Sequence, residues 1–173
     1  KNSIQFIKDA VRTRSQWLGE YPYGNVSIAE AKMGVNGGME YPTITCISPM
    51  PSSKELDLTI EHEVGHNWVY SILASNERNH PWMDEGMNTF FDNRYEKLKY
   101  NNTKNEKKPG DFINNKLPEN NTSLDYRTEI AYKKDQPIET SSENFSELNY
   151  VLTAYYKTGI LMEALENYVG QPL

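Results

Sequence analysis

The sequence predicts an α+β fold, with a small sheet near the N-terminus and helices over most of the remaining chain. Apolar residues recur at helical spacing in four stretches, which are residues 3–18, 53–74, 81–100 and 146–169. Between the first two stretches, Val26 and Ile28 alternate with polar neighbours as in a short strand. A second extended stretch follows at residues 39–47. The strands are therefore expected only in the first part of the chain.

The first predicted helix has signals at both of its ends. Asn2 and Ser3 are candidate capping residues, and Gly19 ends the apolar pattern. The apolar positions are Ile4, Ile7, Val11 and Leu18. After this helix, the sequence Tyr-Pro-Tyr-Gly at residues 21–24 predicts a turn that leads into the first strand.

The two extended stretches are separated by a glycine-containing loop at residues 34–38. Pro42 interrupts the second of these stretches. Because proline has no N–H group to donate to a neighbouring strand, it is expected at a sheet edge. The second extended stretch is therefore predicted to form an edge strand.

The three later helices also have identifiable boundaries. Ser52 or Ser53 can cap the second helix, and Pro81 suits the first turn of the third. Residues 101–144 are rich in Asn, Lys, Glu, Pro and Thr and poor in aliphatic residues, which predicts a long surface excursion that is mobile in part. Gly170 ends the last helix.

Length and charge exclude several classes of protein. With 173 residues the chain is expected to form one domain with a substantial core. It carries 18 basic and 24 acidic residues without a basic stripe, so nucleic acid is not an expected partner. No apolar run is long enough to predict a membrane span. The single cysteine, Cys46, cannot form an internal disulfide or a thiolate metal site.

A metal site is predicted within the second helix by the sequence His-Glu-Val-Gly-His. His62 and His66 lie four residues apart, so both imidazoles project from one helix face as two zinc ligands. Glu85, after an intervening 18 residues, can supply the third ligand and leave a fourth position open for water. Alternatively, the histidines are solvated helix residues and Glu85 is an exposed acid in a first helical turn.

Glu63, between the two histidines, is placed beside the metal without room to bind it. This position suits a general base that takes a proton from water activated by zinc. Asn88 or Thr89, one turn after Glu85, can orient the ligands through hydrogen bonds or be ordinary solvated helix residues.

A second motif lies upstream, in the sequence Gly-Gly-Met-Glu-Tyr at residues 37–41. Together with the zinc motif and its 18-residue gap, it resembles the M1, or gluzincin, family of zinc aminopeptidases. The resemblance implies that Gly37, Gly38 and Met39 belong to an edge strand that pairs with the substrate backbone. It also implies that Glu40 binds the free amino group of the substrate. Alone, this stretch would be only a loop that enters a strand.

A third motif extends the resemblance to the last helix, where Lys157 aligns with a family lysine. This alignment places Tyr155 at the catalytic tyrosine and Tyr150 at a second active-site tyrosine. A slip of one residue, to Tyr156, stays open because Thr158 stands where the family usually has glycine. Alternatively, these tyrosines only pack against the core.

The resemblance implies a thermolysin-like metallopeptidase catalytic domain over residues 1–173, with a small mixed sheet and one zinc ion per chain. The family's flanking N-terminal β-rich and C-terminal helical domains do not fit in this length, so we expect a piece of a longer protein. The expected substrates are peptides with a free N-terminus. A zinc endopeptidase of the thermolysin type and a catalytically inactive zinc-binding module remain alternatives. The expected location is the bacterial cell envelope or exterior.

Overall fold

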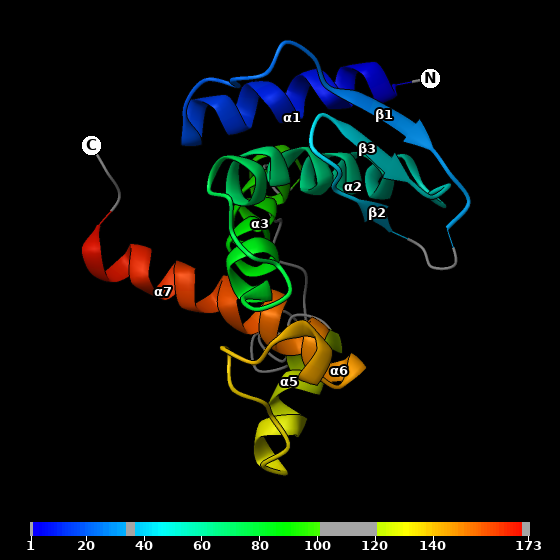
Figure 1. Cartoon of the computed structure of the whole chain (residues 1–173). Coiled ribbons are helices and arrows are strands. Elements are labelled where there is room, and N and C mark those ends of the chain that lie inside the picture. The colour runs from blue at the N-terminus through cyan, green and yellow to red at the C-terminus, as the bar shows by residue number, and fades with distance from the viewer. Residues whose placement is uncertain (1, 34–36, 101–120, 171–173) are drawn as a thin grey trace, which may run out of the picture.

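The computed structural model describes residues 2–33, 37–100 and 121–170 and confirms the α+β fold. Figure 1 shows helix α1 (Ser3–Leu18) and the sheet at one end of the molecule. Helices α2 (Ser53–His66) and α3 (Met87–Tyr100) occupy the middle. Helices α5 (Asn121–Ala131), α6 (Glu147–Asn149) and α7 (Thr158–Val169) lie at the other end. The first helix thus has the bounds that its apolar spacing predicts.

The sheet has three strands in the order β1-β3-β2 and is mixed, as predicted. Strand β1 (Ser27–Glu30) pairs in parallel with β3 (Ile44–Ile47). Strand β2 (Gly38–Met39) pairs antiparallel with β3, so that Met39 lies opposite Cys46. Among the described strands, β2 therefore forms one edge of the sheet.

The second extended stretch proved to be two strands rather than one. The prediction of an edge strand holds for β2 but is wrong for β3, which lies between β1 and β2. Pro42 lies in the turn between β2 and β3, which is why it removes no ladder bond. Thr43 follows in the left-handed region with φ 64°, a conformation that a β-branched residue rarely adopts. Its backbone N–H donates to Oδ1 of Asn67, just beyond α2, at 3.0 Å. This bond ties the turn to the helix that carries the histidines.

Each of the three later helices contains a π-helical segment, which the apolar spacing does not predict. The successive helical segments are α2 (Ser53–His66) with η1 (Asn67–Ile72), then η2 (Trp82–Gly86) with α3 (Met87–Tyr100), then α6 (Glu147–Asn149), η4 (Tyr150–Lys157) and α7 (Thr158–Val169). π-Helical turns are often found at functional sites. Here η2 and η4 contain three of the predicted site residues.

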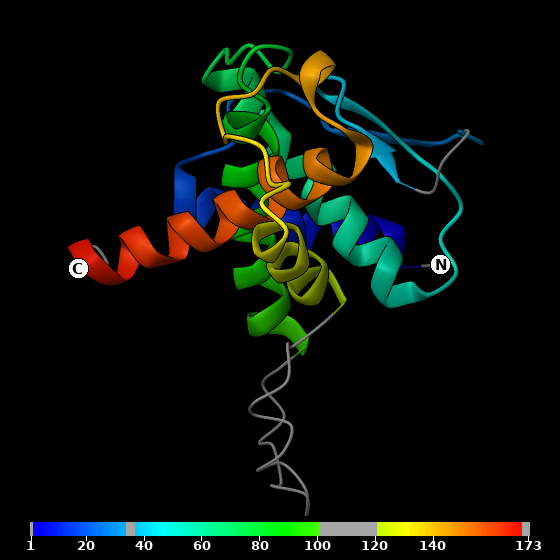
Figure 2. The ribbon, with the colours of Figure 1, turned by 90° about the horizontal axis from the view of Figure 1, so that it is seen from below.

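The predicted surface excursion is largely exposed where the structure describes it, but it contains a helix that its composition did not predict. Residues 121–131 form helix α5 (Asn121–Ala131), and a 3₁₀ turn, η3 (Ser142–Asn144), follows later. The remainder of the prediction, at residues 101–120, lies outside the described residues. Figure 2 shows α5 beside the segment that contains η4. Tyr126 of α5 contacts Tyr156 of η4, with ring centroids 5.6 Å apart, and this aromatic contact helps to hold the polar helix in place.

The core lies where α1 crosses α2 and the sheet. Its buried residues are Phe6, Ala10, Ile47, Ile60, Val64 and Trp68. Ser52 caps α2 and thereby fixes its start, because its Oγ accepts from the N–H of Glu55 and donates to the Glu55 carboxylate. Asn2 makes no side-chain cap bond to the described residues. In the described part of the chain, no helix is long and apolar enough to span a membrane.

Gly86 lies where η2 packs against η4 and α7. A Cβ built on Gly86 would come within 2.2 Å of Cβ of Thr158 and 2.4 Å of the carbonyl oxygen of Ala154. Both distances are well inside van der Waals contact, and the second neighbour is backbone that cannot rotate away. The close packing of these segments therefore depends on the absence of a side chain at this position.

We expect Gly86→Ala to lower the free energy of unfolding of the metal-free chain by about 1–3 kcal/mol, because the added methyl overpacks this contact. Urea unfolding measures the change. Gly24→Ala is the matched control, since Gly24 has no described atom within 4 Å of an added Cβ, and we expect it to stay within about 0.5 kcal/mol of the parent. Equal unfolding midpoints for both variants would contradict the packing argument.

Candidate active site

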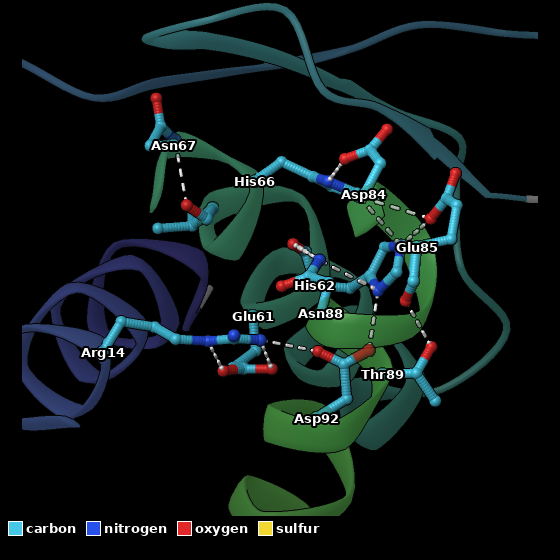
Figure 3. Close-up of polar contacts among 11 residues, drawn as sticks. Arg14, Glu61, His62, His66, Asn67, Asp84, Glu85, Asn88, Thr89 and Asp92 are labelled. Atoms are coloured by element: carbon cyan, nitrogen blue, oxygen red, sulfur yellow. Dashed lines mark hydrogen bonds and ion pairs between the residues drawn. The ribbon is translucent and has the colours of Figure 1, made fainter. Parts of the chain in front are cut away.

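Helix α2 brings His62 and His66 together at its C-terminal end. The Nε2 atoms of the two rings lie 3.2 Å apart, and the rings are nearly perpendicular, with an interplanar angle of 88°. His66 is almost fully buried. Figure 3 shows both rings turned toward η2, where Glu85 lies. The four-residue spacing therefore produces the convergence that the sequence predicts.

Glu85 completes a group of three donor atoms. Its Oε2 lies 3.3 Å from Nε2 of His62 and 3.5 Å from Nε2 of His66. Glu85 is 7% exposed, and its Oε2 has no hydrogen-bond partner among the described residues. The structure thus brings together all three of the predicted metal ligands.

Two aspartates fix which ring nitrogen faces the group. Nδ1 of His62 lies 2.6 Å from Oδ2 of Asp92, and Nδ1 of His66 lies 2.5 Å from Oδ1 of Asp84 (Figure 3). Each carboxylate oxygen accepts the Nδ1 proton, so each ring presents Nε2 to Glu85. Carboxylates that orient ligating imidazoles in this way are usual around zinc.

The donor set fits a zinc ion. Zinc binds imidazole nitrogen and carboxylate oxygen at about 2.0–2.2 Å with tetrahedral geometry, which separates neighbouring ligand atoms by roughly 3.3–3.5 Å. The three separations in the structure are 3.2, 3.3 and 3.5 Å. The buried Glu85 oxygen without a hydrogen-bond partner is also the atom that a cation would satisfy. Three protein ligands leave the fourth position available for water or substrate.

The neighbouring carboxylates stabilise positive charge on the imidazoles of His62 and His66. Burial lowers the pKa of His66, but its hydrogen bond to Asp84 and the nearby Glu85 outweigh burial and raise that pKa to about 10. Burial likewise lowers the pKa of His62, whereas Asp92 raises it well above its usual value. Burial raises the pKa of Glu85, but the two imidazoles hold it far below its usual value. Protons therefore compete with a metal for the two rings.

Glu63 lies beside the ligand group in a nearly closed environment. It is 4% exposed, and its Oε2 has no hydrogen-bond partner among the described residues. Burial, opposed by the charges of the two histidines, raises its pKa to about 7. Its carboxylate lies against β2, where a Cβ on Gly38 would come within 2.2 Å of Glu63 Oε1. Glycine at this position therefore lets the edge strand approach the predicted base.

A pocket of about 350 Å³ opens next to these residues. Its lining residues are Gly38, Met39, Glu40, Glu77, Arg78, Asp84, Glu85, Ser142, Tyr150 and Tyr155. Glu40 directly follows β2. One of its carboxylate oxygens lies within 4.8 Å of a carboxylate oxygen of Glu63 and of a ring nitrogen of His66. Burial raises the pKa of Glu40. Gly37 lies outside this lining, where its carbonyl accepts the N–H of Ser48.

The two predicted tyrosines reach the same pocket from η4. Hydrogen bonds in a π-helix join residues five apart, which places Tyr150 and Tyr155 on one side of the segment. Their rings form an edge contact with centroids 5.7 Å apart, and the Tyr155 ring stacks on His62 at 6.0 Å. Burial and the neighbouring Glu85 carboxylate raise the pKa of Tyr155. Tyr156 instead contacts α5 and does not line the pocket.

Sequence reasoning missed several residues of the site. Asp84 stands next to a predicted ligand, and Asp92 lies two helical turns after Glu85, so helical spacing offered a signal for both. No local signal identifies the pocket-lining Glu77. Asn88, one of two expected orienting residues, donates from Nδ2 to the carbonyl oxygen of His62 at 2.7 Å. The other, Thr89, bonds to the Glu85 carbonyl at 2.8 Å.

Comparison with known proteins agrees with this geometry. The profile of the Peptidase family M1 domain matches residues 12–173. Leucine aminopeptidase 2 of Aspergillus fumigatus is 33% identical over 60 residues, which cover 34% of this chain and 10% of that protein. The enzyme of the same name from Aspergillus oryzae matches with the same identity and coverage. The matched segment thus spans only about a tenth of these curated relatives.

Solved structures show the same fold. A mutant M1 zinc metallopeptidase from Deinococcus radiodurans superposes with a TM-score of 0.66 and 16% identity, over 96% of this chain and 33% of that one. Its complex with a Tyr-Ser-Ala substrate superposes with a TM-score of 0.62 and 18% identity, over 94% of this chain and 32% of that one. The family profile, the fold and the zinc-compatible ligands agree, and the chain belongs to peptidase family M1, whose members are zinc metallopeptidases.

Proposed function

We propose that this chain hydrolyses the N-terminal peptide bond of peptides, as an aminopeptidase. The observation that carries the proposal is the position of Glu40, which shares one pocket with Glu85 and follows directly on the edge strand β2. A peptide that pairs with β2 as an added strand ends at this carboxylate. Glu40 then compensates the desolvated ammonium group and fixes the register at one residue before the bond that is cut.

His62, His66 and Glu85 hold the zinc ion in this proposal. When bound, zinc supplies a Lewis acid that polarises the scissile carbonyl and lowers the pKa of water. Asp84 and Asp92 keep the two imidazoles oriented. The ligands themselves transfer no proton.

Glu63 acts as the general base and then as the general acid. Burial raises the pKa of this carboxyl group above its usual value, which favours a group that can both accept and release a proton. It accepts a proton from the attacking water as the carbonyl is attacked. It then returns that proton to the nitrogen of the leaving amine when the C–N bond breaks. Its burial among the ligands and against Gly38 keeps bulk water away from this exchange.

Tyr155 donates a hydrogen bond to the oxyanion that develops on the attacked carbonyl. Its raised pKa keeps the phenol protonated and therefore able to donate. Stacking on His62 holds the ring beside the ligand group, and an edge contact with Tyr150 also supports it. Tyr150 lines the same pocket, which suits a role in substrate binding.

The two alternatives leave features of the pocket without a role. A thermolysin-type endopeptidase cuts internal bonds and has no need for Glu40 at the end of the substrate strand. An inactive zinc-binding module has no need for the buried Glu63, and a purely structural zinc site usually has four protein ligands. An assay that compares free and blocked substrates separates the three functions.

We expect the zinc-loaded protein to cleave an aminoacyl reporter and to leave the same compound with an acetylated N-terminus intact. Glu40→Gln should lower kcat/KM for the free reporter, and the decrease should correspond to a loss of about 2 to 5 kcal/mol of transition-state stabilisation. The reason is that the ammonium group of the substrate loses both its charged partner and its fixed position. Zinc content should be unchanged. Equal cleavage of both reporters would indicate an endopeptidase, and cleavage of neither would indicate the inactive module.

Tyr155→Phe should lower kcat by roughly a hundred- to a thousandfold with little change in KM, because the lost donor contacts charge that exists only in the transition state. Steady-state kinetics on the same reporter gives both constants. Tyr156→Phe is the matched control one residue away, and its kcat should stay near that of the parent. The opposite result, with kcat lost only in the Tyr156 variant, would overturn the assignment of Tyr155.

We expect one zinc ion per chain, and loss of that zinc in His62→Ala, His66→Ala and Glu85→Ala. The affinity should also fall as pH falls, because the raised pKa values of both rings mean that zinc displaces their protons. Each displaced proton weakens binding about tenfold per pH unit. Titration against a chelator at pH 6, 7 and 8 measures this. Full zinc occupancy in all three variants, or an affinity independent of pH, would refute the ligand assignment.

A further inference from the structure

Helix α1 carries none of the predicted site residues, yet one of its side chains reaches the metal-binding helices. Arg14 is fully buried. Its guanidinium binds both carboxylate oxygens of Glu61, from Nε at 2.5 Å and from one terminal nitrogen, Nη2, at 3.0 Å. The same Nη2 donates to Oδ1 of Asp92 at 2.6 Å. One guanidinium thus joins α1 to both α2 and α3 (Figure 3).

Asp92 connects Arg14 to a predicted metal ligand. While Oδ1 accepts from Arg14, Oδ2 accepts the Nδ1 proton of His62 at 2.6 Å. The carboxylate is therefore held at both oxygens, and its plane fixes the direction of the imidazole. Without the first bond, Asp92 could rotate about its side-chain dihedral angles, and the ring could follow it.

The neighbouring residues are shaped to admit this guanidinium. A Cβ on Gly65 would lie 2.6 Å from Cζ of Arg14 and 2.3 Å from Oδ1 of Asn88, so any side chain at this position of α2 would collide with them. The ring of Phe91 also packs on the guanidinium, with its centroid 5.2 Å from Cζ. The planar fork makes two bonds to Glu61 and one to Asp92, a pattern that an ammonium group cannot reproduce.

We infer that Arg14 is a positioning residue for the zinc site. It acts through Asp92, which holds the imidazole of His62 with Nε2 toward the metal. This inference rests on the ligand assignment made above. His66 is oriented differently, because its acceptor Asp84 is next to Glu85 in η2. The part of the zinc site formed by His62 therefore depends on α1, a helix that carries none of the three ligands.

The test compares the zinc affinities of variants of the full chain, measured by competition with a chelator. Circular dichroism first checks that each metal-free variant is folded under the conditions used. Arg14→Lys keeps the charge but lacks the planar fork that pairs with both oxygens of Glu61 while Nη2 also reaches Asp92. We therefore expect roughly ten- to a hundredfold weaker zinc binding. Asp57→Asn is the matched control on α2. Asp57 is also fully buried, and it binds Tyr95 and Lys99 instead of a metal ligand. Its zinc affinity should stay within about twofold of the parent.

A double-mutant cycle then asks whether Arg14 acts through Asp92. In the Asp92→Asn background, Arg14→Lys should cause little further loss of affinity, because the connection is already broken. Additive losses would overturn the inference, as would an Arg14→Lys affinity within twofold of the parent. If Arg14→Lys does not fold, the double variant Arg14→Gln/Glu61→Gln removes both charges together. Its zinc affinity is then compared with that of Glu61→Gln alone, and a difference within twofold would overturn the inference.

His62→Ala distinguishes failure of this inference from failure of the ligand assignment. Zinc retained in His62→Ala would remove the ligand on which the inference depends. Zinc lost in His62→Ala but bound normally by Arg14→Lys would overturn only the role of Arg14.

Discussion

The approach of three electron-donating atoms to within 3.5 Å of one another is the constraint on which this structure depends. Nε2 of His62, Nε2 of His66 and Oε2 of Glu85 lie 3.2–3.5 Å apart, and their helices have to hold them there. The aspartates behind the rings determine the orientation of both imidazoles. The rest of the site is arranged around this group, namely the proposed base Glu63, the pocket and the two tyrosines.

Three glycines allow the surrounding elements to come close enough. Gly38 admits the Glu63 carboxylate against the edge strand, Gly65 admits the buried guanidinium against α2, and Gly86 admits η4 and α7 against η2. At each position an added Cβ would lie less than 3 Å from another group. The absence of a side chain at these three positions thus allows the helices and the edge strand to pack closely around the site.

The sequence predicted the parts of the site that depend on local geometry. The spacing of His62 and His66 determines their convergence, because helical periodicity alone places both on one face. The π-helical segments were missed, because one wider turn hardly changes the spacing of apolar residues. The five-residue step from Tyr150 to Tyr155 nevertheless agrees with π-helical geometry. Arg14 was missed because its role depends on how α1 crosses α2. Similarly, helix α5, at residues predicted to be a surface excursion, depends on tertiary contact rather than on its polar composition.

Diffraction from crystals of the zinc-loaded protein, measured on both sides of the zinc absorption edge, tests the central claim most directly. The account predicts one anomalous peak, bonded at about 2.0–2.2 Å to Nε2 of His62, Nε2 of His66 and a carboxylate oxygen of Glu85. The carboxylates of Glu40, Glu77 and Asp84 form another group whose oxygens lie within 4.8 Å of one another. A peak within that second group, or bonded to the histidines through Nδ1, would contradict the account.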